Sequence, residues 1–216
     1  IPHKQAVLEQ VAVADDVVTG AGAANTLLFT PEGIRAHNTD VPAAMAAIDT
    51  VVNHPNQGDA LRGTSALILG AGGAARGIAY GLLRRGLEVT ISGRTDDRAS
   101  ELAEQLGCKA IPWSKRARVD CGLLVNCTPA GMHPNVDDSP LEKHHFKPRQ
   151  IVFDTVYNPE STVLIKHARR QNCRVVTGIE MFIRQAALQF ELMTGRPGPL
   201  DLMGDVLRRA ISPVSY

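Results

Sequence analysis

Residues 65–77 read SALILGAGGAARG, and this stretch decides the fold. The apolar run Ser65–Leu69 predicts a short buried strand, and the glycines from Gly70 onward predict a tight turn. The Ala- and Leu-rich residues that follow, up to Arg85, predict a helix, and Gly86 stands just past its end. The stretch therefore predicts a strand, a glycine turn and a helix in that order.

The chain beyond Gly86 repeats this alternation. Further apolar runs predict strands at Leu87–Ser92, Cys108–Ile111, Leu123–Val125, Ile151–Thr155 and Arg174–Val176. Predicted helices separate them at Asp96–Leu106, where Thr95 can act as the N-cap and Gly107 ends the helix, and at about Glu160–Arg170. Strands that alternate with helices at this spacing predict an α/β fold with a doubly wound, parallel sheet of the Rossmann type.

The two ends of the chain do not continue this pattern. Residues 1–35 predict a helix, a glycine turn at Gly20–Ala24 and a strand at Thr26–Thr30. Beyond Gly178, one apolar helix face runs to Thr194, and the break at Gly195–Pro199 precedes a last amphipathic helix, Leu200–Ile211. We expect a partial α/β substrate domain built from both ends: residues 1–40, then a Rossmann domain at 41–177, then a connecting helix and a returning C-terminal helix at 178–216.

Composition excludes several classes of protein. The 216 residues carry 23 basic and 22 acidic side chains, a formal charge of +1 that argues against nucleic-acid binding. The four cysteines form neither a CxxC pair nor a metal-ligand pattern, so we expect reduced thiols, no metal and a cytoplasmic protein. No apolar run is long enough to cross a bilayer. The chain opens without an initiator Met, and we expect a fragment, a processed product or one module of a fusion. The sequence makes no prediction of the oligomeric state.

The glycine turn fits the dinucleotide-binding fingerprint in its form with alanine at the third position. Gly70 permits the tight turn, Gly72 lets backbone amides approach a pyrophosphate, and Ala75 keeps the helix close to the strand. The helix N-terminus adds partial positive charge. The alternative is a tight turn that binds nothing.

The end of the second predicted strand indicates which dinucleotide binds. NAD enzymes place Asp or Glu there to accept hydrogen bonds from the ribose 2′-hydroxyl, whereas this chain reads SGRTDDR at 92–98. Arg94 can stack on adenine and pair with a 2′-phosphate, and Thr95 adds a hydroxyl donor, so we predict NADP. In the alternative interpretation Arg94 is a solvated surface residue, and Asp96 or Asp97 accepts the ribose hydroxyls of NAD.

Seven short motifs in this order resemble the shikimate dehydrogenase family. They are IPHK at 1–4, GAANT at 22–26, NTD at 38–40, GAGGAA at 70–75, NCTPAGM at 126–132, YNP at 157–159 and GIEMFIRQA at 178–186. Each motif is unspecific alone, but the ordered series is specific and extends over essentially the whole chain. The segments that open the family's members, before Pro-His-Lys, are not in this sequence.

The resemblance implies a proton relay and a substrate site. Lys4 is implied to exchange a proton with the reacting hydroxyl, and Asp40 to hold and polarise Lys4. Asn25, Tyr157 and Gln185 are implied to bind the substrate together with this pair. Without the resemblance, each has a plain alternative: a solvated lysine, a helix-capping aspartate, a turn asparagine, an edge tyrosine and a polar-face glutamine.

The resemblance also implies where the cofactor lies. The residues implied to contact NADP are Gly70, Ala71, Gly72, Gly73, Ala74, Arg94, Thr95 and Arg98, with Asn126, Thr128, Gly178 and Met181 on the nicotinamide side. The implied function is the NADPH-dependent, reversible reduction of 3-dehydroshikimate to shikimate in aromatic amino acid biosynthesis. Two alternatives remain: a quinate/shikimate dehydrogenase that uses NAD, and a catalytically silent, ligand-sensing homologue.

Overall fold

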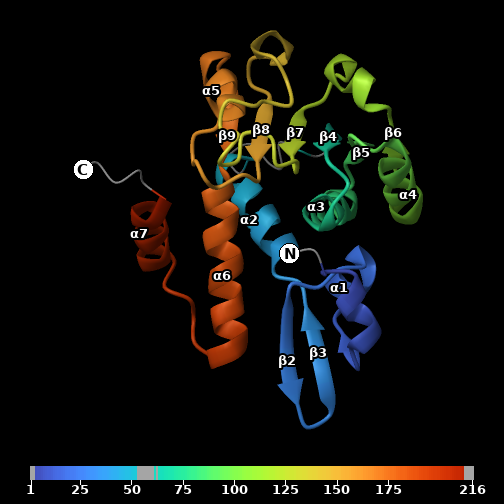
Figure 1. The fold of residues 1–216 in the computed structure, drawn as a ribbon, viewed down its shortest axis with the longest axis vertical. Coiled ribbons are helices and arrows are strands. Elements are labelled where there is room, and N and C mark those ends of the chain that lie inside the picture. The colour runs from blue at the N-terminus through green and yellow to red at the C-terminus, as the bar shows by residue number, and fades with distance from the viewer. Residues whose placement is uncertain (1–2, 53–60, 62, 212–216) are drawn as a thin grey trace.

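The structure, a computed structural model, describes residues 3–52, 61 and 63–211 (Figure 1). Ile1 and Pro2, the first half of the IPHK motif, lie outside the described residues. Two sheets are present in the described chain, a large one in the middle of the sequence and a small one near its start.

The large sheet has six parallel strands in the order β6-β5-β4-β7-β8-β9. Their bounds are β4 Ser65–Leu69, β5 Glu88–Ser92, β6 Lys109–Ala110, β7 Leu123–Asn126, β8 Ile151–Asp154 and β9 Arg174–Val176. The strand order reverses between β4 and β7, as in the Rossmann fold, and ligands of such sheets bind outside the carboxyl ends of the strands at this point. The predicted fold class is therefore confirmed, and each strand lies within one residue of its predicted bounds.

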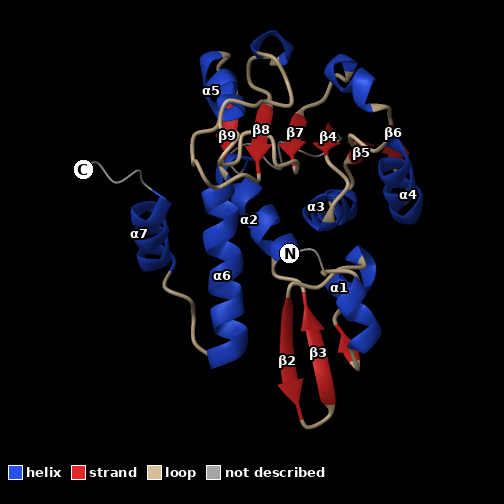
Figure 2. Cartoon of the chain, in the orientation of Figure 1, coloured by secondary structure: helices blue, strands red, loops and turns tan. Residues whose placement is uncertain are grey.

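Apolar residues on both faces of the strands explain why the sheet is covered on both sides. Ala66 and Ile68 of β4 belong to one buried cluster, and Leu67 and Leu69 belong to the other. The first cluster includes residues of α2 (Asp40–Val52), α3 (Gly73–Arg84) and α4 (Asp96–Leu106), and the second includes residues of α5 (Val163–Arg170). Figure 2 shows α3 and α5 on opposite sides of the sheet.

Helices α3 and α4 end at the predicted glycines, whereas the capping of α4 and the start of α5 differ from the prediction. Gly86, at φ +80°, follows the end of α3, and Gly107, at φ +68°, ends α4. Thr95 occupies the N-cap position of α4, but its side chain makes no capping hydrogen bond, so the predicted cap is positional only. Helix α5 begins at Val163 rather than about Glu160, because the Thr162 side chain caps it by accepting from the Ile165 amide.

The small sheet has the order β1-β3-β2 and contains two strands that the sequence did not predict. After η1 (Ala6–Gln10) come β1 (Val13–Ala14), α1 (Asp16–Ala21), the expected β2 (Thr26–Thr30) and β3 (Gly33–His37). β2 and β3 form an antiparallel hairpin, and β1 pairs in parallel with β3. The sequence did not predict β3 because this strand contains no apolar run. Ala36 is its one buried residue.

Two long helices connect the small sheet to the large one. α2 packs along α6 (Gly178–Thr194), and Figure 1 shows both running from the large sheet towards the β2–β3 hairpin. α7 (Leu200–Ile211) packs on α6. Arg208 of α7 places its Nε 3.7 Å from Glu160 Oε2 and its Nη2 3.6 Å from Glu180 Oε1 of α6. The expected return of α7 to the substrate domain, and the division at residues 40 and 177, stay predictions. None of the described helices has the length and apolar character that crossing a membrane requires.

Candidate active site

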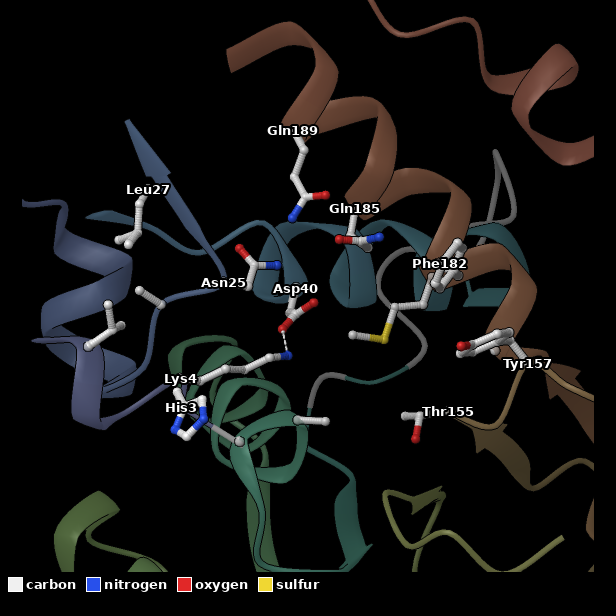
Figure 3. Close-up of a pocket in the computed structure, with 16 residues that line it drawn as sticks. His3, Lys4, Asn25, Leu27, Asp40, Thr155, Tyr157, Phe182, Gln185 and Gln189 are labelled. Carbon is white, nitrogen blue, oxygen red and sulfur yellow. Dashed lines mark hydrogen bonds and ion pairs between the residues drawn. The ribbon is translucent and has the colours of Figure 1, made fainter. Parts of the chain in front are cut away.

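A cleft of about 510 Å³ opens where the two sheets meet the connecting helices (Figure 3). Its walls come from the start of the chain, β2, the beginnings of α2 and α3, the loop after β8, and α6. Nine of the residues predicted from the sequence line it: Lys4, Asn25, Asp40, Gly73, Ala74, Tyr157, Gly178, Met181 and Gln185. Residues far apart in the chain therefore share one cavity.

Lys4 and Asp40 form an ion pair in this cleft. Lys4 Nζ lies 2.5 Å from Asp40 Oδ2, and the two side chains are 20% and 9% exposed. A lysine ammonium has three N–H donors, so one bond to Asp40 leaves two for a bound molecule. The pair is arranged as expected for a proton-transferring lysine held by an aspartate, and its part in a reaction stays a prediction.

The side chains of Asn38 and Asp40, at the start of α2, make separate contacts. Asn38 Oδ1 accepts from the amides of Asp40 and Val41, so Asn38 rather than Asp40 caps α2. Its Nδ2 donates to the Ala23 carbonyl at 2.8 Å, which ties α2 to the glycine turn before β2. The Asp40 side chain is thereby free to face Lys4.

Asn25 is held from two sides, and this limits what it can do. Its Oδ1 accepts from the Thr39 amide at 2.9 Å and from the Thr26 hydroxyl at 3.0 Å, and its Nδ2 donates to Thr39 Oγ1 at 2.9 Å. An amide has two acceptor sites and two donors. Only one N–H of Asn25 therefore remains for a ligand, which must present an oxygen acceptor to it.

One face of α6 supplies Phe182, Gln185 and Gln189 to the cleft. Within the described chain the Gln185 side chain has no hydrogen-bond partner, whereas Gln189 Nε2 donates to Thr26 Oγ1 at 3.0 Å. The centroid of the Phe182 ring lies 4.5 Å from that of the Tyr157 ring. Tyr157 reaches the cleft from the loop after β8. Gln185 and Tyr157 are thus available to a ligand, and Gln189 is committed to the wall.

The glycine turn between β4 and α3 has the space that a pyrophosphate needs. Gly70 adopts φ +114°, and a Cβ on it would lie 2.9 Å from the Cys127 carbonyl oxygen, so only glycine fits there. A Cβ on Gly72 would meet nothing within 4 Å, so open space borders this residue. The first amides of α3 lack acceptors within the helix and lie at this space. These residues fit a dinucleotide.

The predicted 2′-phosphate residues lie outside the cleft. Arg94, Thr95 and Arg98 are exposed after the carboxyl end of β5, the strand next to β4. A dinucleotide that starts at the glycine turn and extends along the carboxyl edge of the sheet would bring its adenosine half to β5. The arrangement is compatible with the prediction and does not test it.

The predicted nicotinamide-side residues Asn126 and Thr128 belong to a buried network. Asn126 Oδ1 accepts from the Thr128 amide at 3.0 Å and hydroxyl at 2.7 Å, and its Nδ2 donates to Asp154 at 3.0 Å and to the Ala130 carbonyl at 3.4 Å. These bonds use the whole amide of Asn126. The side chain therefore shapes the loop after β7, and direct contact with a cofactor stays a prediction.

Asp154, which the sequence did not single out, closes this network. Its carboxylate accepts from Asn126, from the Val156 amide at 3.1 Å and from the Thr162 hydroxyl at 2.6 Å. Burial raises the pKa of Asp154 to about 6, although these three hydrogen bonds lower it. A signal existed, because Asp154 ends the wholly apolar run Ile151–Phe153 and had to be buried with it.

We predict that replacing Asp154 with Asn changes how stability depends on pH. An unfolded aspartate titrates near pH ~3.9, so between about pH 4 and pH 6 the folded chain binds more protons and its free energy of unfolding falls as pH rises. This contribution is present below about pH 4 and lost by about pH 7, and two pKa units correspond to at most about 3 kcal/mol. Urea unfolding of Asp154→Asn should show a flatter profile, and parallel profiles for variant and parent would contradict the prediction.

Gly178 and Met181 form the corner where α6 begins. A Cβ on Gly178 would lie 2.4 Å from the Val156 carbonyl oxygen, so the helix approaches the loop after β8 too closely for any side chain. Met181 is buried and lines the cleft. Close packing against the loop after β8 thus explains why residue 178 is glycine, and its contact with a cofactor stays a prediction.

The cleft also contains residues that the sequence did not assign to it. They are His3, Val7, Ala24, Leu27, Thr155, Phe182 and Gln189. Phe182 and Gln189 could have been found, since they lie three residues before and four residues after Gln185 on one helix face. Thr155 follows directly after a parallel strand, where ligands of such sheets gather.

Neither a metal cluster nor a disulfide is found in the described part of the chain. Burial raises the pKa of the Cys121 and Cys173 thiols to about 11, and burial also raises the pKa of Cys127 beside the glycine turn. These thiols remain protonated near neutral pH and are poor nucleophiles.

Two family models match parts of this chain, and a named relative matches it over its whole length. Residues 178–208 match the family described as "Shikimate 5'-dehydrogenase C-terminal domain", and residues 65–158 match that described as "NADP oxidoreductase coenzyme F420-dependent". The shikimate dehydrogenase (NADP(+)) of Moorella thermoacetica is 35% identical over 100% of this chain and 75% of its own length.

Two solved structures share the fold. Shikimate 5-dehydrogenase from Thermus thermophilus, in complex with NADP(H) and shikimate, has a TM-score of 0.84 and 34% identity, covering 97% of this chain and 77% of that one. Quinate dehydrogenase from Corynebacterium glutamicum, in complex with NAD, has a TM-score of 0.85 and 29% identity, covering 96% and 75%.

Proposed function

This chain belongs to the shikimate dehydrogenase family, and from that membership we propose that it catalyses the reversible, NADPH-dependent reduction of 3-dehydroshikimate to shikimate. This reaction is a step of aromatic amino acid biosynthesis. The observation that carries the proposal is the Lys4–Asp40 ion pair, which lies in a cleft that the first residues of α3, at the glycine turn, also line. A proton donor and a dinucleotide-binding turn are thus next to one cavity.

Five polar residues of the cleft have roles in the proposed reaction. In reduction, Lys4 Nζ donates a proton to the oxygen that becomes the hydroxyl, and in oxidation it accepts that proton. Asp40 keeps the ammonium oriented and balances its charge. The one free N–H of Asn25, the free amide of Gln185 and the hydroxyl of Tyr157 bind and orient the ring hydroxyls of the substrate.

When bound, NADPH would supply the hydride in reduction, and NADP+ would accept it in oxidation. Gly70 and Gly72 give the cofactor space, and we propose that the amides of Ala71, Gly72, Gly73 and Ala74 lie against its pyrophosphate. Arg94, Thr95 and Arg98 recognise the 2′-phosphate. Asn126, Thr128, Gly178 and Met181 shape the nicotinamide side. The Moorella thermoacetica relative, named as an NADP(+) enzyme, and the Thermus thermophilus structure in complex with NADP(H) support this choice of cofactor.

The strongest competing function is a quinate dehydrogenase that uses NAD, because one structural neighbour carries that name and cofactor. Arg94 favours NADP instead, since a guanidinium pairs with a phosphate and NAD has none at this position. The presence of both Lys4 and Asp40 argues against a silent sensor. Initial rates of shikimate and quinate oxidation with NADP and with NAD separate these functions. The proposal requires shikimate with NADP to be fastest, and faster oxidation of quinate with NAD would overturn it.

We predict that Arg94→Ala weakens NADP binding about ten- to a hundredfold and changes NAD binding only a few-fold. A hydrogen bond to a charged group contributes ~1.5–3 kcal/mol, and ~1.4 kcal/mol corresponds to tenfold in affinity. Calorimetric titration with both cofactors measures this without a substrate. Arg170→Ala, which removes an exposed arginine at the end of α5, is the matched control and should change neither affinity. Equal losses for NADP and NAD would mean that Arg94 has a structural role.

We also propose a cytoplasmic location and a small-molecule substrate, shikimate or 3-dehydroshikimate, as the binding partner. The described cysteines are all free thiols, as is usual in reducing compartments.

A further inference from the structure

Lys4 lies directly on the first residue of α3. A Cβ on Gly73 would come within 3.1 Å of Lys4 Cδ, 3.6 Å of its Cβ and 3.8 Å of its Cγ. Ordinary contacts between carbon atoms are about 3.5–4.0 Å, so the nearest of these distances is too short. The aliphatic stem of Lys4 therefore occupies the space where any other residue at position 73 would place its side chain.

The backbone gives no reason for glycine at position 73. Gly73 is not in the left-handed region, unlike Gly70 in the same turn. It is the first residue of a twelve-residue helix, where alanine is the better helix former. The three atoms nearest to a Cβ at this position all belong to Lys4.

Lys4 has little freedom to avoid a larger residue. Its carbonyl oxygen accepts from the Ala24 amide at 2.8 Å, and its Nζ is bound to Asp40 at 2.5 Å. Both ends of the residue are thus fixed, and the part between them crosses Gly73. A methyl group there requires the stem to shift by a few tenths of an ångström between these two fixed ends, which strains the contact of the ammonium with Asp40.

We propose that Gly73 is a positioning residue for Lys4. Because glycine has no side chain, it leaves the space in which the Lys4 stem lies, and from there the ammonium reaches Asp40. This inference rests on the proposed function, because it assigns Gly73 to the proton-transfer half of the site. Gly72, where a Cβ would meet nothing, serves the cofactor side. The Cβ positions of two adjacent glycines therefore have separable roles, while the backbone amides of both face the proposed cofactor.

The test compares Gly73→Ala with Gly72→Ala. Gly73→Ala keeps the backbone amide, so NADP affinity should stay within a few-fold while kcat falls on the order of tenfold, because a misplacement of about 1 Å costs about 100-fold and the shift here is smaller. Gly72→Ala fills the open space and should raise the Kd for NADP on the order of tenfold. Circular dichroism and the thermal midpoint of unfolding verify that both variants are folded.

A double mutant shows whether Gly73 acts through Lys4. In the Lys4→Ala background the stem is gone, so Gly73→Ala should lower kcat no further. An equal loss of kcat in both backgrounds would overturn the inference, as would a Gly73→Ala enzyme with the parent kcat, or one in which kcat and NADP affinity fall together.

The position of Lys4 can also be read without turnover. Reductive methylation with formaldehyde and a borohydride, followed by peptide mass spectrometry, reports how freely the Lys4 ammonium reacts. Gly73→Ala should change this rate, and Gly72→Ala should leave it at the parent value. If the parent turns over no 3-dehydroshikimate, the proposed function fails. Equal methylation rates of Lys4 in the parent and in Gly73→Ala would refute the positioning role of Gly73 independently of that function.

Discussion

Replacing Lys4 with Ala is expected to lower kcat by about 10²- to 10⁴-fold while NADP binding stays nearly unchanged. The reason is that a positioned general acid–base contributes this much to a proton transfer. Lys4 contacts Asp40 in the cleft, and the predicted 2′-phosphate residues are elsewhere on the sheet. Steady-state kinetics with 3-dehydroshikimate and NADPH give kcat, and calorimetric titration gives the affinity for NADP.

Lys166→Ala is the matched control for this change. Lys166 is an exposed lysine on α5, which covers the face of the large sheet opposite α3. Its removal should leave kcat unaltered. Near-normal turnover in Lys4→Ala would exclude Lys4 as the proton donor, and a matching loss of NADP affinity would indicate that Lys4 holds the cofactor site together.

Asp40→Asn is expected to reproduce much of the loss seen in Lys4→Ala. The amide keeps the size of the carboxylate but cannot balance the ammonium charge that lies 2.5 Å away. The capping of α2 should survive, because Asn38 and not Asp40 accepts from the first amides of the helix. The thermal midpoint should therefore fall little while kcat falls strongly.

The double mutant Lys4→Ala/Asp40→Asn tests whether the two residues act as one unit. Residues of one relay have effects that are far from additive, so the double mutant should be about as slow as the slower single mutant. Losses in kcat that multiply would mean that Lys4 and Asp40 act separately, and the paired role would be rejected.

The large sheet could be predicted because its central strands, β4, β7 and β8, are buried on both faces. Runs such as Ala66–Leu69 and Ile151–Phe153 are continuous and apolar, and glycines mark the ends of α3 and α4. The β3 strand lacked such a signal because Ala36 is its one buried residue. The sequence thus predicts those elements whose burial is visible in their composition.

The candidate site was predictable only in part, for a physical reason. The proximity of Lys4 and Asp40 depends on how the start of the chain folds against α2 and α3, and no local pattern encodes such a distance. Here the resemblance to a family supplied what spacing could not. The hydrogen bonds that limit Asn25 to one free donor and that consume the Asn126 amide depend on Thr39 and Asp154, whose directions only the structure shows.

The most direct test of the central claim follows the hydride itself. NADPH carrying deuterium at both C4 positions of its dihydronicotinamide is incubated with 3-dehydroshikimate and the protein, and the product is analysed by mass spectrometry and NMR. The account predicts shikimate with deuterium on the carbon of the newly formed hydroxyl, and loss of nearly all of this product in Lys4→Ala. Absence of deuterated shikimate with the parent protein, or equal labelling by the Lys4→Ala variant, would contradict it.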